Sequence, residues 1–135
     1  MKKIAIGVLI LFVLAGFGAF RTSTFRTGDN TLPTRFYIAT YGTTSTINWD
    51  NSDKQKITLS DNTTFDFING DNGQTCILFV IQDGTGSRTV TWDAACKFPG
   101  GVTPVLTTTA NAVDIFTFIC DGTNYYCVGY ASDVK

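Results

Sequence analysis

Residues 76–92 read CILFVIQDGTGSRTVTW, and this stretch decides the fold class. Its first part, residues 76–82, is apolar at both odd and even positions, so a strand formed there must be buried on both faces. Turn-forming residues follow at 83–86, and Val90 and Trp92 then alternate with polar neighbours. Because two strand-like runs flank a short turn that contains glycine, we expect a β-hairpin here.

A second run of the same kind lies at residues 113–120, which read VDIFTFIC. Both of its faces carry apolar side chains, and the turn-forming residues 121–124 lead from it into a further strand-like segment at 125–130. A small domain can bury one such strand between two layers, whereas two such strands require additional cover. We therefore expect a homo-oligomer, with a trimer as the specific hypothesis, in which a neighbouring subunit supplies that cover.

The rest of the sequence consists of short alternating segments that are separated by turn residues. Further strands are expected at residues 35–40, 44–49, 56–60, 64–68, 87–92 and 105–109. Glu is absent, while Thr and Phe, which favour strands, are abundant. The pattern predicts an all-β domain over residues 34–135, a jelly-roll-like β-sandwich of about eight to ten short strands.

The first twenty residues differ from the rest, because two lysines precede an uninterrupted apolar run at residues 4–20. A helix of that length spans about 25 Å, which is sufficient for a thin bilayer. Arginines follow the run, so a retained membrane anchor is one interpretation of residues 1–20. A cleaved signal peptide is the alternative, although Phe17 and Phe20 disrupt the small residues that a cleavage site needs. Residues 21–33 are polar and read as a linker.

Charge and residue types argue against several functions. The formal net charge is −1 and no basic patch is visible, so nucleic acid is not an expected partner. His is absent, which removes Ser-His-Asp and Cys-His arrangements, and the absence of both His and Glu removes the commonest general bases and metal ligands. We therefore expect no catalytic residue, no metal site, no cofactor and no enzymatic activity.

The cysteines are four in number and stand at positions 76, 96, 120 and 127. No two of them have the C-x-x-C spacing of a metal or redox motif. An exported domain could join them in one or two disulfides, whereas apolar neighbours favour buried thiols, and both alternatives stay open. A bridge between Cys120 and Cys127 depends on the register of the strands that carry them.

Four stretches are similar to a known β module. They read ITLSDNTTF at 57–65, QDGTGSRTVTW at 82–92, KFPGGVTPVLTTTANAVDIFTF at 97–118 and DGTNYY at 121–126. Together, residues 57–130 resemble a repeating module of bacteriophage tail fibres, appendages and related virion proteins. The resemblance implies a β-sandwich-like virion domain, often oligomeric, that builds or tips an adhesive device.

Two features depart from that module. The chain has its own apolar run at residues 4–20, and it has Cys96 where an aliphatic residue is more usual. The first departure indicates a membrane-held virion protein, such as a spike, minor capsid or fibre-like protein of a phage with an internal membrane. We expect it to contact other virion proteins. An exported protein of the bacterial cell surface is the alternative location.

Aromatic side chains are the candidate ligand-binding groups, because their rings can stack on a cell-surface glycan. We single out Trp49, Tyr125 and Tyr126, of which the two tyrosines must point to opposite faces of a strand. Nearly all the aspartates considered as candidate carboxylates lie beside Gly or Asn and read as turn residues. The sequence thus predicts a virion module for assembly and attachment to a host receptor. A lectin-like bacterial adhesin is the alternative, and an Asp-dependent glycosidase is a remote third.

Overall fold

The structure is a computed structural model that describes residues 36–135. The expected membrane helix or signal peptide at residues 1–20 and the expected linker at residues 21–33 lie outside the described residues. From residue 36 onward, no helix has the length and apolar character that a transmembrane span requires.

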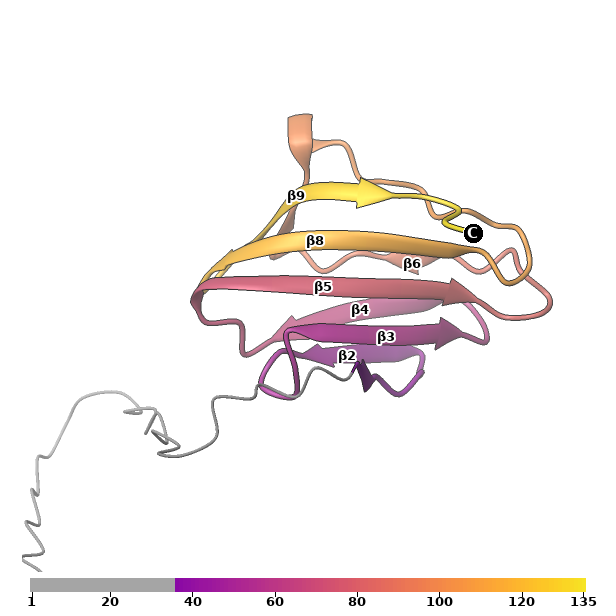
Figure 1. Cartoon of the computed structure of the whole chain (residues 1–135), viewed down its shortest axis with the longest axis horizontal. Helices are drawn as coiled ribbons and strands as arrows, with labels where there is room; N and C mark the ends of the chain where they lie inside the picture. The colour runs from indigo at the N-terminus through magenta and orange to yellow at the C-terminus, as the bar shows by residue number, and fades with distance from the viewer. Residues whose placement is uncertain (1–35) are drawn as a thin grey trace, which may run out of the picture. The chain divides into compact units, whose positions relative to one another are not determined.

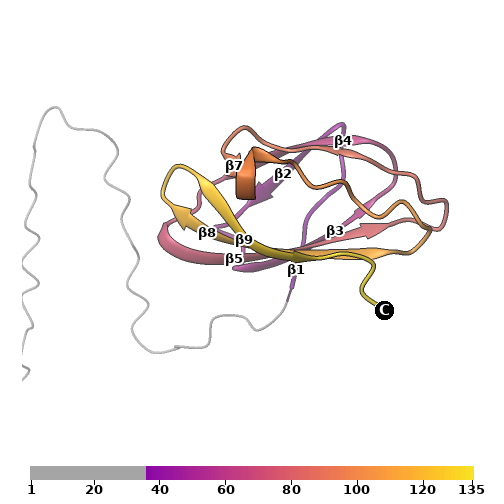
Figure 2. The ribbon, with the colours of Figure 1, turned by 90° about the horizontal axis from the view of Figure 1, so that it is seen from above.

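Two β-sheets build this part of the chain, which confirms the all-β class. The strands are β1 (Tyr37–Ile38), β2 (Thr44–Asn48), β3 (Lys54–Leu59), β4 (Thr63–Ile68), β5 (Asn72–Gln82), β6 (Val90–Thr91), β7 (Cys96–Lys97), β8 (Val113–Asp121) and β9 (Tyr125–Ala131). The large sheet has the order β1-β3-β5-β8-β9-β7 and the small sheet the order β2-β4-β6. Figure 1 views the large sheet from its outer side, and Figure 2 shows the two sheets as separate layers.

From β1 to β6 the chain winds as a parallel coil, in which successive strands enter the large and the small sheet in turn. Parallel ladders join β1 to β3 and β3 to β5 in one sheet, and β2 to β4 and β4 to β6 in the other. The predicted hairpin at residues 83–86 is therefore wrong, because β5 and β6 lie in different sheets. The jelly-roll-like topology is also wrong, since jelly rolls are antiparallel and this coil is not.

The C-terminal part is an antiparallel hairpin. Strand β8 pairs antiparallel with β5 on one side and with β9 on the other, and residues 121–124 form the turn between β8 and β9, as predicted. The two-residue strand β7, which the sequence did not indicate, pairs in parallel with β9.

Residues 105–109 were expected to form a strand, and they form none. The backbone N–H of Thr107 donates instead to Oδ2 of the buried Asp114, at 2.7 Å, and the side chain of Leu106 packs into the core with 6% exposure. Because a side chain satisfies this backbone group, the segment needs no neighbouring strand.

The core between the sheets is dominated by aromatic rings. Phe67 on β4 is central to it, with ring centroids 5.1–6.5 Å from those of Trp49, Phe65, Trp92, Phe118 and Tyr125. Trp92 was expected in the core, and it is partly buried there, with its ring 4.7 Å from that of Phe116. Phe67 thereby links the parallel coil to the hairpin.

The outer face of the large sheet is apolar along its central strands. Strand β5 contributes Ile77, Phe79 and Ile81 to this face, and β8 contributes Val113, Ile115 and Ile119. All of these except Ile119 are half-buried, and Ile119 is 37% exposed. The two strands with apolar residues on both faces thus bury their inner side chains fully and their outer side chains only in part.

Candidate ligand-binding site

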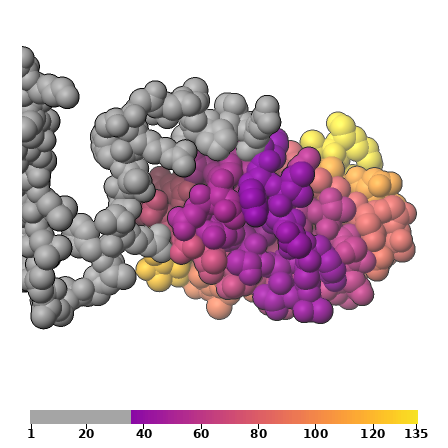
Figure 3. Space-filling view, turned by 90° about the horizontal axis from the view of Figure 1, so that it is seen from below, coloured from indigo at the N-terminus to yellow at the C-terminus, as the bar shows by residue number. Residues whose placement is uncertain are grey.

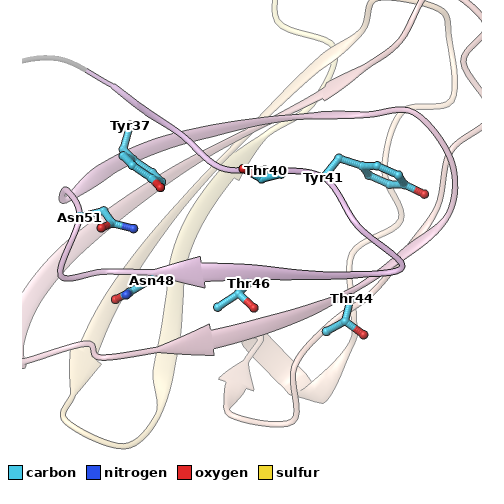
Figure 4. A pocket seen from close by; sticks show the side chains of 7 residues that line it. All are labelled: Tyr37, Thr40, Tyr41, Thr44, Thr46, Asn48 and Asn51. Atoms are coloured by element: carbon cyan, nitrogen blue, oxygen red, sulfur yellow. The ribbon is translucent and has the colours of Figure 1, made fainter.

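A polar pocket lies beside the first turn of the coil, between the chain that leaves β1 and strand β2 (Figure 4). Its cavity volume is about 360 Å³. The side chains that line it are those of Tyr37, Thr40, Tyr41, Thr44, Thr46, Asn48 and Asn51. The two tyrosines and Thr40 lie on one side of the pocket and the β2 residues on the other. Figure 3 shows the indigo and purple residues of this first turn gathered on one face.

Strand β2 forms one wall because alternate residues of a strand point to opposite faces. Ser45 and Ile47 are buried, with 1% and 0% exposure, and face the core. Their neighbours Thr44, Thr46 and Asn48 must therefore point outward, where they line the pocket. A parallel ladder with β4 along its whole length holds β2 in place.

The opposite wall is held by a small hydrogen-bond network at the entry to β2. The Thr63 hydroxyl lies 2.9 Å from that of Ser45 and donates to the Gly42 carbonyl at 2.7 Å. The Gly42 N–H in turn donates to Ser45 Oγ at 3.2 Å. The phenol of Tyr41 is tied down separately, because its hydroxyl donates to the Asn62 carbonyl at 3.4 Å. These contacts fix the segment that carries the aromatic side of the pocket.

Asn48 closes the far end of the pocket and is itself fixed. Its Oδ1 accepts hydrogen bonds from the Asp50 N–H and from Asn69 Nδ2, both at 3.1 Å. Its backbone carbonyl accepts from the Asn51 N–H at 3.1 Å and from Gln55 Nε2 at 2.7 Å. With Oδ1 occupied, Nδ2 is the donor that this amide can offer to a ligand.

No charged side chain is among the seven that line the pocket. Its polar groups are hydroxyls and amides, which donate and accept hydrogen bonds and carry no formal charge. The arrangement therefore has the chemistry of a binding site for a neutral, polar ligand.

The ligand-binding residues predicted from the sequence are not assembled into this pocket. Trp49 and Tyr125 are buried, with 2% and 3% exposure, and their rings lie 6.3 Å apart in the core. The Tyr125 hydroxyl accepts the Gly70 N–H at 2.9 Å, and burial raises the pKa of Tyr125 to about 12. Tyr126, next along β9, is 45% exposed, as expected for the opposite face. Of the three, Tyr126 alone presents its ring for a contact.

All four cysteines, at positions 76, 96, 120 and 127, are buried free thiols. The hairpin register places Cys120 opposite Tyr125 and Cys127 opposite Phe118, so the two cysteines are diagonal neighbours and form no bridge. Diagonal pairs are about 7–8 Å apart, beyond the usual span of a disulfide. Burial raises the pKa of Cys76 to about 12 and raises that of Cys96 as well, which keeps both thiols protonated and unreactive.

Two of the candidate aspartates, Asp83 and Asp121, serve turns, in agreement with the sequence-based expectation. Oδ1 of Asp83 accepts the N–H groups of Thr85 and Gly86 at 3.0 and 2.8 Å, and Arg88 pairs with the same carboxylate at 2.9 Å. The hydrogen bond from Arg88 lowers the pKa of Asp83. Asp121 plays the same role in the hairpin turn. In the region covered by the structure, no three His, Cys, Asp or Glu side chains are grouped so as to hold a metal ion.

Sequence reasoning missed the pocket, although part of the signal was present. The predicted strand at residues 44–49 contains the alternation that turns Thr44 and Thr46 outward. What the sequence could not indicate is that Tyr37 and Tyr41 lie across from these threonines. That placement depends on the coil, which sends β1 and β2 into different sheets.

Comparison with known protein families finds a match to part of the chain. Residues 38–125, which are close to two thirds of the chain and run from β1 into β9, match the family described as "Putative phage tail fibre C-terminal domain". No curated protein matches the sequence.

Proposed function

The chain belongs to the phage tail fibre C-terminal domain family, and from this premise we propose that it is a non-enzymatic virion module for assembly and host attachment. Family membership supports a structural or attachment role in the virion. The finer assignment, a spike, minor capsid or fibre-like protein that contacts other virion proteins, is our proposal.

Self-association is the part of this function that the outer face of the large sheet supports best. The register pairs Phe79 with Ile115 and Ile81 with Val113, and Ile38 lies in the same row as Phe79 with Lys56 between them. Contiguous apolar surface of this kind is typical of protein interfaces. On this face Lys54 and Lys56 stand on β3, and Asp121 follows Ile119 at the end of β8, so the charges lie at the margins of the apolar β5–β8 patch. We propose that a second copy of the chain covers this face.

Light scattering of the full-length protein in mild detergent tests self-association. We expect a mass that is a multiple of the protomer, with a trimer as the specific prediction. Ile119→Asp places a charge on the face and should shift the protein toward the protomer. Val105→Asp is the matched control, because Val105 is 85% exposed outside the sheets and should tolerate the charge. A protomer mass for the unchanged protein contradicts the proposal.

The apolar run at residues 4–20 supports a further proposal, that the module is anchored to a membrane, such as an internal membrane of the virion. The intact mass of the native protein distinguishes retention from cleavage as a signal peptide. Flotation with lipid vesicles should carry the full-length chain, and a chain that begins beyond residue 20 should not float. Recovery of a chain that has lost residues 1–20 would overturn the anchor and leave the rest of the function standing.

A lectin-like adhesin of the bacterial surface is the second candidate function, because the polar pocket beside β2 would serve a surface adhesin as well as a virion module. Immunogold electron microscopy of purified particles separates the candidates. Label on the virion supports the first. A protein found on cells and absent from particles would establish the second.

A further inference from the structure

We propose that the pocket between the β1 segment and β2 binds a neutral saccharide unit of the host cell surface. The proposal rests on the attachment function above and names both the ligand class and the site. Its premise is geometric: two aromatic rings and a row of strand hydroxyls line one open pocket of about 360 Å³ (Figure 4). Small-molecule sites are commonly about 300–1,000 Å³ in volume, so a cavity of this size suits a short saccharide.

The wall formed by β2 matches the polar edge of a sugar. Thr44 and Thr46 are both exposed, and their hydroxyls can donate and accept, as sugar hydroxyls also do. Asn48 adds an amide donor whose position is fixed through its Oδ1. Because successive outward residues of a strand are about 7 Å apart, the three groups can contact hydroxyls on different parts of one saccharide.

The opposite wall matches the apolar face of a sugar ring. Tyr37 is 40% exposed, and Tyr41 is held by the bond from its hydroxyl to Asn62. A tyrosine ring combines an apolar face with a polar tip, which suits ligands that are themselves amphipathic. Because this hydrogen bond already restricts the Tyr41 side chain in the free protein, less conformational entropy is lost when a ligand binds against its ring.

The absence of charge among the lining residues selects for neutral sugars. An acidic saccharide would place its carboxylate or phosphate in the pocket without a cationic partner, at the cost of desolvation. Neutral hexoses and their N-acetyl derivatives carry no such penalty.

A peptide strand added to the free edge of β2 would be a different occupant, and the backbone disfavours it. Strand addition needs a continuous row of unpaired N–H and C=O groups. At one end, Asn48 has its carbonyl occupied by Gln55 and Asn51. At the other end, the N–H and the carbonyl of Gly42 are occupied by Ser45 and Thr63. Only a short central piece of the edge is left for pairing.

The test is binding of the full-length protein to an array of bacterial-surface oligosaccharides that includes neutral, acidic and amino sugars. Affinities for each bound saccharide follow from surface plasmon resonance. We expect neutral saccharides to bind, and Tyr37→Ala and Thr46→Val each to weaken binding about tenfold, the effect of losing one ring contact or hydrogen bond. Thr44→Val is a second hydroxyl variant, to be used if Thr46→Val lowers the melting temperature.

The matched control is Thr91→Val, which removes an exposed strand hydroxyl from β6, outside the pocket and outside the face proposed for self-association, and should leave affinity unchanged. Binding that survives both pocket variants but is lost in Tyr126→Ala would place the site on β9 and overturn the proposal. Binding of acidic saccharides alone, or of an extended peptide but no saccharide, would overturn it as well. If the protein is present on virions but binds no saccharide, the proposed saccharide site is refuted and the attachment function still stands. If the protein is absent from virions, the attachment function itself is refuted.

Discussion

The corner at residues 83–86 and the turn at residues 121–124 begin with the same three residues, Asp-Gly-Thr, and their aspartates act in the same way. In each, the aspartate Oδ1 accepts two backbone N–H groups, those two and three residues later in the chain. The first nevertheless carries the chain from one sheet to the other, and the second closes a hairpin. Local turn chemistry therefore fixes a change of direction without fixing which strand becomes the partner.

The difference lies in what surrounds each turn. At the coil corner, the side chain of Gln82 satisfies the backbone of Arg88: Nε2 donates to the Arg88 carbonyl at 2.8 Å, and Oε1 accepts the Arg88 N–H at 2.9 Å. This amide replaces the first rung of a hairpin ladder, so the chain can leave the sheet with its backbone groups paired. The hairpin turn has a backbone rung instead, from the Asp121 N–H to the Asn124 carbonyl at 3.1 Å.

Removal of the ring that joins the two regions should have the largest effect. Phe67 has 5% exposure and contacts the coil through Phe65 and the hairpin through Phe118. We expect Phe67→Ala to lower the free energy of unfolding by about 3–5 kcal/mol, because a large cavity opens in the shared core. Denaturant unfolding followed separately by fluorescence and far-UV circular dichroism measures it. If the two probes give coincident unfolding curves in the variant, the coil and the hairpin still unfold together. If the curves separate, Phe67 is what couples the unfolding of the two regions.

Glycine substitutions at the two turns sharpen the comparison. Gly86 and Gly122 both have positive φ, +73° and +89°, so alanine is strained at either position. At Gly86 a Cβ would also lie 2.5 Å from the Thr108 carbonyl oxygen, whereas at Gly122 its nearest neighbour is at 3.7 Å. We expect Gly86→Ala to cost about 3 kcal/mol and Gly122→Ala about 1 kcal/mol, the strain alone.

Thermal melts or denaturant titrations of the two glycine variants, made in the full-length chain, provide the measurement. Equal losses would mean that the coil corner shifts to accommodate the added methyl group. In that case the packing of the corner against residues 108–110 is not what holds it in place.

The smallest expected effect is a pH dependence that distinguishes the two aspartates. Backbone N–H groups of Asn124 and Thr123 lower the pKa of Asp121 to about 2, whereas Arg88 is the main cause of the lowered pKa of Asp83. A carboxylate whose pKa is lower in the folded state stabilises the fold above its unfolded value, near 4, and loses that contribution as the pH falls toward 2. Asp121→Asn should therefore lower the melting temperature at pH 5 and flatten its decline between pH 4 and 2.

Salt provides the contrast between the two carboxylates. The contribution of Asp83 should weaken in high salt, because it depends on a solvent-accessible ion pair with Arg88. The contribution of Asp121 depends on hydrogen bonds from the backbone and should change little. Equal salt sensitivity in Asp83→Asn and Asp121→Asn would show that this distinction between the turns is incorrect.

The sequence predicted what depends on neighbours along the chain. The alternation in residues 56–60 and 64–68 placed β3 and β4 correctly, and residues 121–124 gave the hairpin. The sequence could not predict which strands pair with one another. The hydrogen bonds from Gln82 to the Arg88 backbone, for example, form only when the chain after β5 turns toward the small sheet. The strand expected at residues 105–109 failed for a related reason: Asp114 satisfies that backbone from a distant part of the chain.

The pocket belongs with these non-local features. Tyr37 and Thr46 are nine positions apart in the sequence and lie in different sheets, so no periodicity connects them. The apolar residues of the outer face are the contrasting case. A strand that is apolar on both faces, such as 76–82, can be recognised from the sequence alone.

The short length of most edge strands bears on crowding. Both outermost strands of the large sheet, β1 and β7, have two residues, as does β6 at one edge of the small sheet. A long, flat edge strand can pair with an edge strand of another molecule and so start aggregation, and short edge strands are one way in which proteins prevent this. Many copies could therefore be held at high local density with little tendency to pair through β1, β6 or β7, whereas the five-residue β2, flanked by threonine and asparagine, is a longer edge strand.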